Sequence, residues 1–231
     1  MTKKIVIIMQ VLFIIALPIV LIFTDVQLST FDLDYYQKKY EEYNIMRKTG
    51  IEKDDLMYIT EELLDYLRGD REGIKIWANV NGEKEQIFES REIAHLYDVK
   101  ELFSKGFLTR NISLVILFLS FIFIIIYNRK SLYKTVIISC LIPLGIMLVM
   151  GILLATDFYK YFTYFHLILF DNDLWLLDPK TDILIQMYPL SFFNSIAYKI
   201  ITMFLIELLA ILTFGLILKT NRFIKKLNIN R

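Results

Sequence analysis

The chain has 231 residues, of which 56% are hydrophobic and 15% aromatic, and its formal net charge is +1. This hydrophobic fraction is too high for an ordinary soluble domain and indicates a membrane protein. Cys140 is the one cysteine, so a disulfide framework is excluded. With a net charge near zero, no nucleic-acid partner is expected.

Four apolar segments are predicted to be transmembrane helices, because lipid leaves no other structure for such a backbone. They are residues 5–24, 112–127, 135–155 and 198–218. The first is predicted to be a retained anchor, because it is longer than a typical signal core and no small-x-small cleavage site follows it. The last contains Glu207, which we expect to be protonated or hydrogen-bonded to Gln10, Ser139 or a neighbouring helix rather than to relay protons.

Basic residues are distributed unevenly around these spans. Residues 1–4, 128–134 and 219–231 contain ten lysines and arginines and no acidic residue. Residues 25–111 and 156–197, in contrast, contain more acidic than basic side chains. The positive-inside rule therefore predicts that both termini and the middle loop are cytoplasmic, and that the two larger segments form an extracytoplasmic cap.

The first part of the cap is predicted to begin with two amphipathic helices. Tyrosines spaced among charged residues indicate a helix over residues 31–46. Leucine and isoleucine residues that share one face indicate another over residues 54–67, and Gly69 follows it as a plausible stop.

Two β-hairpins are predicted to complete a small α+β cap. Asn81-Gly82 is a strong hairpin signal, because both turn positions can take positive φ. A second turn is predicted at the sequence that begins with Asp178-Pro179. The four predicted strands are residues 74–80, 83–88, 174–177 and 183–187.

The chain has two histidines, His95 and His166. Asp98 and Glu101 have the spacing of a helix N-cap and its acidic partner, so His95 is predicted to lie on the turn that precedes the helix. His166 ends a segment that is rich in Phe and Tyr and follows the third span, a composition typical of the headgroup layer.

Either histidine alone is compatible with a structural role, and the aromatic residues alone are compatible with a membrane belt. The predicted exterior, however, contains no GxSxG elbow, no HExxH helix, no cysteine and no glycine-rich phosphate loop. If the protein is an enzyme, imidazole is therefore the leading catalytic group.

These two histidine blocks resemble the bacterial lipoprotein intramolecular transacylase (Lit) family. The resemblance covers the whole chain and rests on His95-Leu-Tyr-Asp-Val-Lys100 and on Phe165-His166, in that order and topology. Leu169 stands where an aromatic residue is expected. Further matching residues are Asn172, Trp175, Leu177-Asp178-Pro179, Thr181-Asp182, Leu184-Ile185, Pro189 and Phe193.

The resemblance implies an enzyme of the bacterial cytoplasmic membrane that acts on a diacylated lipoprotein within the bilayer. Its reaction moves the sn-2 acyl chain of the diacylglyceryl group to the α-amino group of the lipoprotein's own N-terminal cysteine, leaving a lyso-form lipoprotein. The family is held to use two histidines, and these correspond to His95 and His166.

Imidazole suits this reaction, because a free α-amino group with a pKa of ~7.7 to 8.0 must lose a proton and the glycerol oxygen must gain one. The hypothesis assigns His166 as the base and His95 as the acid, or the reverse, without an acyl-enzyme, a metal or a cofactor. Supporting roles go to Asp98 in orienting an imidazole, to Asn172 as an oxyanion donor, and to Tyr97, Phe165 and Trp175 as walls.

Two other functions remain open at this stage. The main alternative is a non-enzymatic membrane protein whose cap binds a lipid or a partner protein, with the histidines packed or pH-sensing. A weaker alternative is a metal-assisted lipid hydrolase built on both histidines with Asp98 or Asp171. The latter predicts chelator sensitivity and released fatty acid, neither of which is expected for direct transfer.

Overall fold

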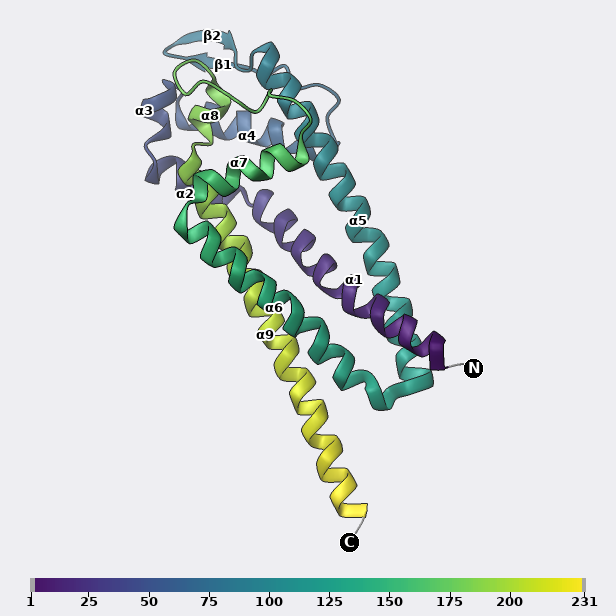
Figure 1. The fold of residues 1–231 in the computed structure, drawn as a ribbon. Coiled ribbons are helices and arrows are strands. Elements are labelled where there is room, and N and C mark those ends of the chain that lie inside the picture. Colours follow the sequence, from purple (N-terminus) through teal and green to yellow (C-terminus); the bar gives the residue numbers. More distant parts are fainter. Residues whose placement is uncertain (1–2, 230–231) are drawn as a thin grey trace. The chain divides into compact units, whose positions relative to one another are not determined.

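The computed structural model describes the backbone of residues 3–229 and the side chains of residues 3–220. This part of the chain is mostly helical, with one two-stranded antiparallel sheet (Figure 1). The helices are α1 Lys3–Thr30, α2 Leu33–Glu42, α3 Ile45–Thr49, α4 Lys53–Arg68, α5 Ser90–Asn128, α6 Leu132–Thr156, α7 Phe158–Leu169, α8 Ile183–Met187 and α9 Leu190–Ile229. The strands are β1 Trp77–Val80 and β2 Glu83–Gln86, and the 3-10 turn η1 is Arg129–Ser131.

The chain divides into two compact units. The first, which we call the apolar unit, comprises Met1–Val26, Phe107–Ala155 and Ile200–Arg231. The second, which we call the α+β unit, comprises Gln27–Gly106 and Thr156–Lys199.

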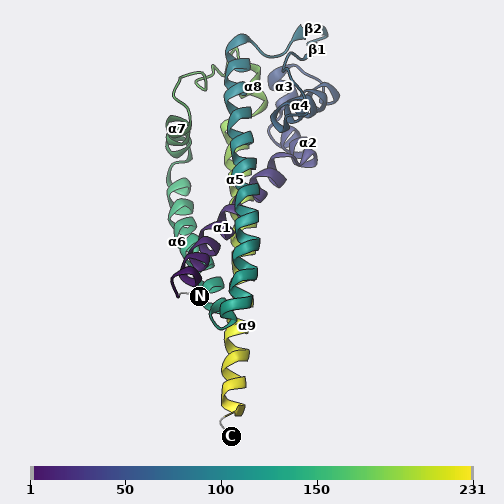
Figure 2. The ribbon, with the colours of Figure 1, turned by 90° about the vertical axis from the view of Figure 1, so that its right-hand side faces the viewer.

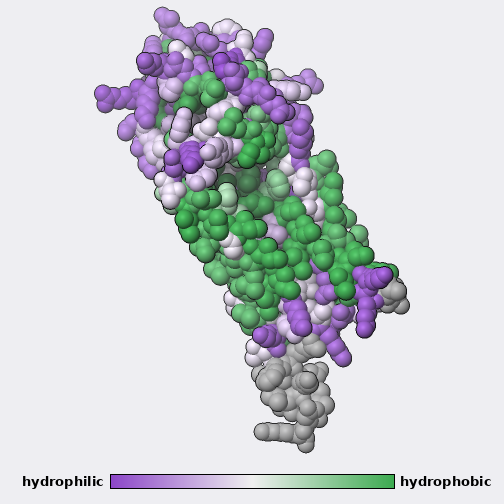
Figure 3. All heavy atoms as spheres, in the orientation of Figure 1, coloured by the Kyte–Doolittle hydropathy of each residue, from purple (hydrophilic) through white to green (hydrophobic). Residues whose placement is uncertain are grey.

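The apolar unit contains helices suited to a membrane. Three helical stretches are long and apolar enough to cross one: Lys3–Thr30, Ser90–Thr156 and Leu190–Thr220. The second of these joins α5 to α6 through η1. Figure 3 shows hydrophobic side chains covering much of the visible surface of these helices. Exposing so much apolar surface to water would be unfavourable, whereas lipid accommodates it.

Inside the apolar unit, a few polar groups contact one another between helices. The side-chain amide of Gln10 donates to the hydroxyl of Thr135 (3.0 Å), which links α1 to α6. Ser139 bonds the carbonyl of Val136 (2.8 Å) in its own helix, so the two polar residues expected near Glu207 have other partners. Oε2 of Glu207 is buried without a hydrogen-bond partner among the described residues, and so are both carboxyl oxygens of Asp25.

The α+β unit begins with three short helices where two were predicted. Asp32 caps α2, because its carboxylate accepts from the backbone N–H of Tyr35 (3.3 Å). The helix predicted over residues 31–46 is interrupted at Asn44, which takes the left-handed conformation (φ 54°). Gly69, at φ 96°, ends α4 as predicted.

The hairpin around Asn81-Gly82 is confirmed, although its strands are shorter than predicted. Asn81 (φ 52°) and Gly82 (φ 89°) both take positive φ, and Trp77 pairs with Gln86 at the open end of the hairpin.

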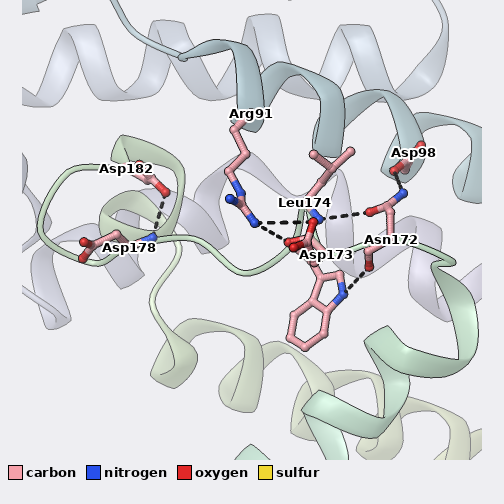
Figure 4. Close-up of polar contacts among 8 residues, drawn as sticks. Arg91, Asp98, Asn172, Asp173, Leu174, Asp178 and Asp182 are labelled. Carbon is pink, nitrogen blue, oxygen red and sulfur yellow. Dashed lines mark hydrogen bonds and ion pairs between the residues drawn. The ribbon is translucent and has the colours of Figure 1, made fainter.

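The second predicted hairpin is wrong, because residues 183–187 form helix α8. Leu184 and Met187 are both buried in the core of the α+β unit. Residues three apart lie on one side of a helix but on opposite faces of a strand, so a helix buries both. The turn itself is present, since the carboxylate of Asp182 accepts from the backbone N–H of Asp178 (2.7 Å, Figure 4).

The start of α5 also differs from the prediction, because Asp98 does not cap the helix. The helix begins at Ser90, and the carboxylate of Glu92 accepts from the backbone N–H of Glu89 (2.7 Å), as in a capping box. The other oxygen of Glu92 accepts from Leu184 (2.7 Å), so this buried side chain also fastens α8. His95 therefore lies inside α5, in its second turn, and not on a turn before it.

Candidate active site

His95 and His166 come together in the α+β unit, although 70 residues separate them in the sequence. Their ring centroids are 6.2 Å apart, and the ring planes are inclined by 36°. Each side chain is buried, with an exposed fraction of 8%. Helix α5 supplies His95 and helix α7 supplies His166, so both rings are fixed by regular structure rather than by loops.

The tautomer of His166 follows from its hydrogen bond. Nδ1 lies 2.7 Å from the carbonyl oxygen of Phe162, one helical turn earlier. Because a carbonyl can only accept, Nδ1 carries the proton and Nε2 presents a lone pair. The ring is thereby prepared to accept a proton at Nε2.

Aromatic rings surround the histidine pair. The ring of Phe170 contacts both imidazoles, at 5.4 Å from His95 and 5.6 Å from His166. Trp175 stacks on His166 at 4.8 Å, and Phe162 approaches it edge-on at 4.5 Å. These contacts limit the access of water to both rings.

This environment favours neutral imidazoles. Burial, assisted by the nearby ring of His166, lowers the pKa of His95 from 6.5 to about 4, and Asp98 opposes that shift. Burial also lowers the pKa of His166, and its hydrogen bond to Phe162 opposes the change. Nδ1 of His95 is buried and has no hydrogen-bond partner among the described residues. A buried donor or acceptor of this kind is available for a ligand.

The segment after α7 is fastened to α5 by polar contacts (Figure 4). The side-chain amide of Asn172 donates to the carboxylate of Asp98 (2.8 Å), and its oxygen accepts from the backbone N–H of Leu174 (3.1 Å). The indole N–H of Trp175 donates to the carbonyl of Asn172 (2.9 Å). Arg91 reaches the carbonyl of Asp173 (2.6 Å). These bonds determine where Trp175 stacks on His166.

The predicted supporting residues are therefore only partly gathered around the histidines. Phe165 lies 5.4 Å from His166, and Trp175 stacks on it, so both are in the site. Asn172 and Asp98 bond to each other and position the segment that carries Trp175. Tyr97 is exposed and lines a separate cleft with Tyr66 and Ile93.

Sequence reasoning missed Phe162 and Phe170 as partners of the histidines. Phe162 could have been found, because it lies one helical turn before His166 in α7, whereas Phe170 follows the last residue of α7 in extended backbone, so its contacts with the histidines depend on the fold. The anchoring role of Arg91 had no local signal, since its partner Asp173 is far away in the sequence. Among the described residues, no group of three or more His, Cys, Asp or Glu side chains could hold a metal ion.

Comparison with known proteins identifies the family. The sequence model of the lipoprotein intramolecular transacylase Lit family matches residues 11–193. A protein of Aquifex aeolicus (strain VF5), described as uncharacterized, is 27% identical over 208 residues, which are 86% of this chain and 92% of that protein.

Solved structures share the fold. The in meso structure of the membrane integral lipoprotein intramolecular transacylase Lit from Bacillus cereus superposes with a TM-score of 0.83 at 19% identity, covering 96% of this chain and 100% of that one. A variant of the Bacillus cereus protein, with one histidine replaced by alanine, gives a TM-score of 0.75 at 19% identity, with 95% and 96% of the chains covered. Because the family match extends over most of the chain, the protein belongs to the lipoprotein intramolecular transacylase family and is a membrane acyltransferase.

Proposed function

We propose that this acyltransferase moves the sn-2 acyl chain of a diacylglyceryl-modified lipoprotein to the α-amino group of the same N-terminal cysteine. The products are an amide at the cysteine nitrogen and a free hydroxyl on the glycerol, which together give the lyso-form lipoprotein. The observation that supports this reaction best is the pair of buried imidazoles, His95 and His166, at 6.2 Å within aromatic walls.

His166 is proposed as the base. Its Nε2 lone pair accepts a proton from the attacking amine while nitrogen bonds the ester carbonyl carbon. When the resulting intermediate collapses, the bond from that carbon to the glycerol oxygen breaks. His95 donates its ring proton to this oxygen as the proton on His166 passes to His95, so both imidazoles are neutral again and no imidazolate remains.

The lowered pKa of both rings keeps them neutral before the reaction. Because burial lowers the pKa of both His95 and His166, the pair enters the reaction uncharged at neutral pH. An uncharged imidazole can accept the amine proton without first losing one of its own. Proton balance is preserved, because one proton leaves nitrogen and one arrives at oxygen.

No enzyme nucleophile is required, because the attacking amine and the ester belong to one molecule. The protein's main contribution is then to bring a flexible substrate into a reactive conformation. Such positioning can supply about 7 to 11 kcal/mol of the barrier reduction. The rings of Phe170 and Trp175 also limit the water that would otherwise hydrolyse the ester.

The proposal includes a topology. Residues 5–24, 112–127, 135–155 and 198–218 form four transmembrane helices, and both termini are cytoplasmic. The α+β unit is extracytoplasmic, on the side where matured lipoproteins expose their cysteine. In support, the long stretch Ser90–Thr156 is divided by η1 into two helices, and η1 carries Arg129 and Lys130.

The decisive experiment is mass spectrometry of a lipoprotein's N-terminal peptide. The lipoprotein is co-expressed with this enzyme in cells that lack other N-acyltransferases. The wild type should give an amide-linked acyl chain and the loss of one ester. His95→Ala and His166→Ala should each abolish this product, whereas Tyr58→Ala, at an exposed position of α4, should preserve it.

If both histidine variants produce the lyso-form at near wild-type rates, the proposed mechanism is wrong. The same spectra test the metal-assisted hydrolase, which predicts loss of the ester without formation of an amide. They also test a purely binding cap, which predicts no change in the lipoprotein.

A further inference from the structure

Helix α7 exposes an apolar face on the side opposite His166. Tyr164 is 47% exposed, Leu167 is 61% exposed and Ile168 is 80% exposed. Successive residues are 100° apart around a helix, so Ile168 lies about 200° from His166. The same helix therefore presents the imidazole on one face and hydrophobic side chains on the other.

The rest of the α+β unit does not cover this face. The hydrophobic core of the unit contains no residue of α7. The inner face of α7 makes its contacts through His166 and through Phe162, which lies 5.0 Å from Phe193. Figure 2 shows α7 on one side of α5 and helices α2 to α4 on the other. The outer face is therefore free to meet something outside the unit.

The covalent connection of α7 to α6 indicates what the exposed face of α7 meets. Helix α6 ends at Thr156 and α7 begins at Phe158, with only Asp157 between them. Each residue can span at most about 3.6 Å, so α7 starts close to the end of an apolar helix that is suited to a membrane. Asp157 caps α7 by accepting from the backbone N–H of Lys160 (3.0 Å), which fixes the residue at which α7 begins.

The composition of α7 fits the boundary between headgroups and acyl chains. Lys160 is its one charged residue, and its Nζ lies 5.8 Å from the ring of Tyr161 and 5.9 Å from that of Tyr164. Tyrosines at the interface, with a lysine whose amine extends toward headgroups, are typical of helices that lie in the membrane plane. Large contiguous apolar patches of this kind are rare on surfaces that face water.

We propose that Tyr164, Leu167 and Ile168 insert into the interfacial layer of a glycerophospholipid bilayer and thereby set the depth of His166 in the membrane. The insertion itself stands on the exposed face and its connection to α6. The role in setting depth rests on the proposed function, because it matters only if His166 acts on an ester at that level of the membrane.

Spin labelling tests the insertion directly. The full-length protein carries Cys140→Ala and a nitroxide on Ile168→Cys, in vesicles of phosphatidylethanolamine and phosphatidylglycerol. Tyr58→Cys, on α4 of the same unit, provides the matched control. We expect dissolved oxygen to relax the label at 168 more strongly than a water-soluble nickel chelate does, and the reverse at 58. Stronger relaxation by the nickel chelate at 168 would overturn the proposal.

Measurements of turnover test whether α7 sets the depth of His166 in the membrane. Ile168→Asp should lower turnover of a vesicle-embedded diacylated lipoprotein by about fivefold, in line with the cost of a charge near the interface. Ile168→Leu and Tyr58→Asp should retain wild-type turnover. Full turnover by Ile168→Asp would contradict the role in depth. If the label at 168 is in lipid but both histidine variants remain active, the proposed function fails and the insertion stands.

Discussion

At the scale of single residues, Phe170 is the side chain that both histidines share. Its ring touches the rings of His95 and His166 at 5.4 and 5.6 Å and contributes to the burial that lowers both pKa values. A lower pKa keeps an imidazole neutral at lower pH. Both rings should therefore stay neutral as the pH falls below 6.5, the ordinary pKa of histidine, so that protonation of the substrate amine alone slows the reaction there.

The first prediction is that Phe170→Ala shifts the acid limb of the pH–rate profile upward. Removing the ring admits water and returns the pKa of His95 and His166 toward 6.5, so protonation inactivates the variant at a higher pH. We expect a shift of about one pH unit, measured as initial rates of amide formation between pH 4 and 8. The substrate amine titrates equally in both enzymes, so it cancels in the comparison. An unchanged acid limb would show that burial by Phe170 does not control the catalytic proton.

The second prediction concerns the bond between Asp98 and Asn172. Asp98→Ala should lower turnover by about two- to tenfold, the loss expected for one hydrogen bond, because the segment that places Trp175 over His166 is released. Asp98→Asn should retain most of the activity, since its amide oxygen can still accept from Asn172. If Asp98 instead acted through its charge on His95, both variants would lose equally. The measurement is turnover with saturating lipoprotein, with the fluorescence of Trp175 in a Trp77→Phe background as a readout of its position.

At the scale of elements, local signals predicted some helix and hairpin ends well. Gly69 ends α4 and Asn81-Gly82 turns the hairpin, because both positions need a left-handed backbone that glycine and asparagine tolerate. Asp98 shows the opposite case: its capping pattern was present, but α5 had already begun at Ser90. The start of α5 is capped by Glu92, whose second partner, Leu184, is far away in the sequence. A rule confined to a few residues cannot include such a partner.

The third prediction is that Glu207→Gln in α9 leaves acyl transfer within about twofold of the wild type. A carboxylate in an apolar span is costly, and Gln keeps the shape while removing the ionisable group. Asp25 lies in α1 of the same unit and is fully buried, so Asp25→Asn should be made in parallel. The measurements are membrane insertion by immunoblot and formation of the amide-linked product. A stably inserted Glu207→Gln that cannot transfer the acyl chain would assign Glu207 a catalytic or binding role.

At the scale of the whole molecule, the sequence predicted a membrane protein and singled out the two histidines as candidate catalytic residues. It did not predict the distance between their rings. Composition and apolar periodicity suffice for helices suited to a membrane, because the bilayer imposes length and polarity on each segment separately. The convergence of His95 with His166 depends on packing between segments joined by two long helices. Only the resemblance to the family linked them in advance. Phe170 was missed for the same reason, since its contact with His95 exists only after folding.

The fourth prediction tests the orientation of the chain in the membrane. In a Cys140→Ala background, Glu72→Cys lies in the α+β unit and Thr220→Cys lies at the end of the last apolar stretch, and both positions are exposed. The positive-inside rule places the former outside and the latter in the cytoplasm. A membrane-impermeant maleimide should therefore label position 72 in intact spheroplasts and position 220 only after permeabilisation. Neither substitution removes a basic residue, so the charge bias that sets orientation is kept. Labelling of position 220 in intact spheroplasts would reverse the topology and would move the histidine pair to the wrong side of the membrane for a matured lipoprotein.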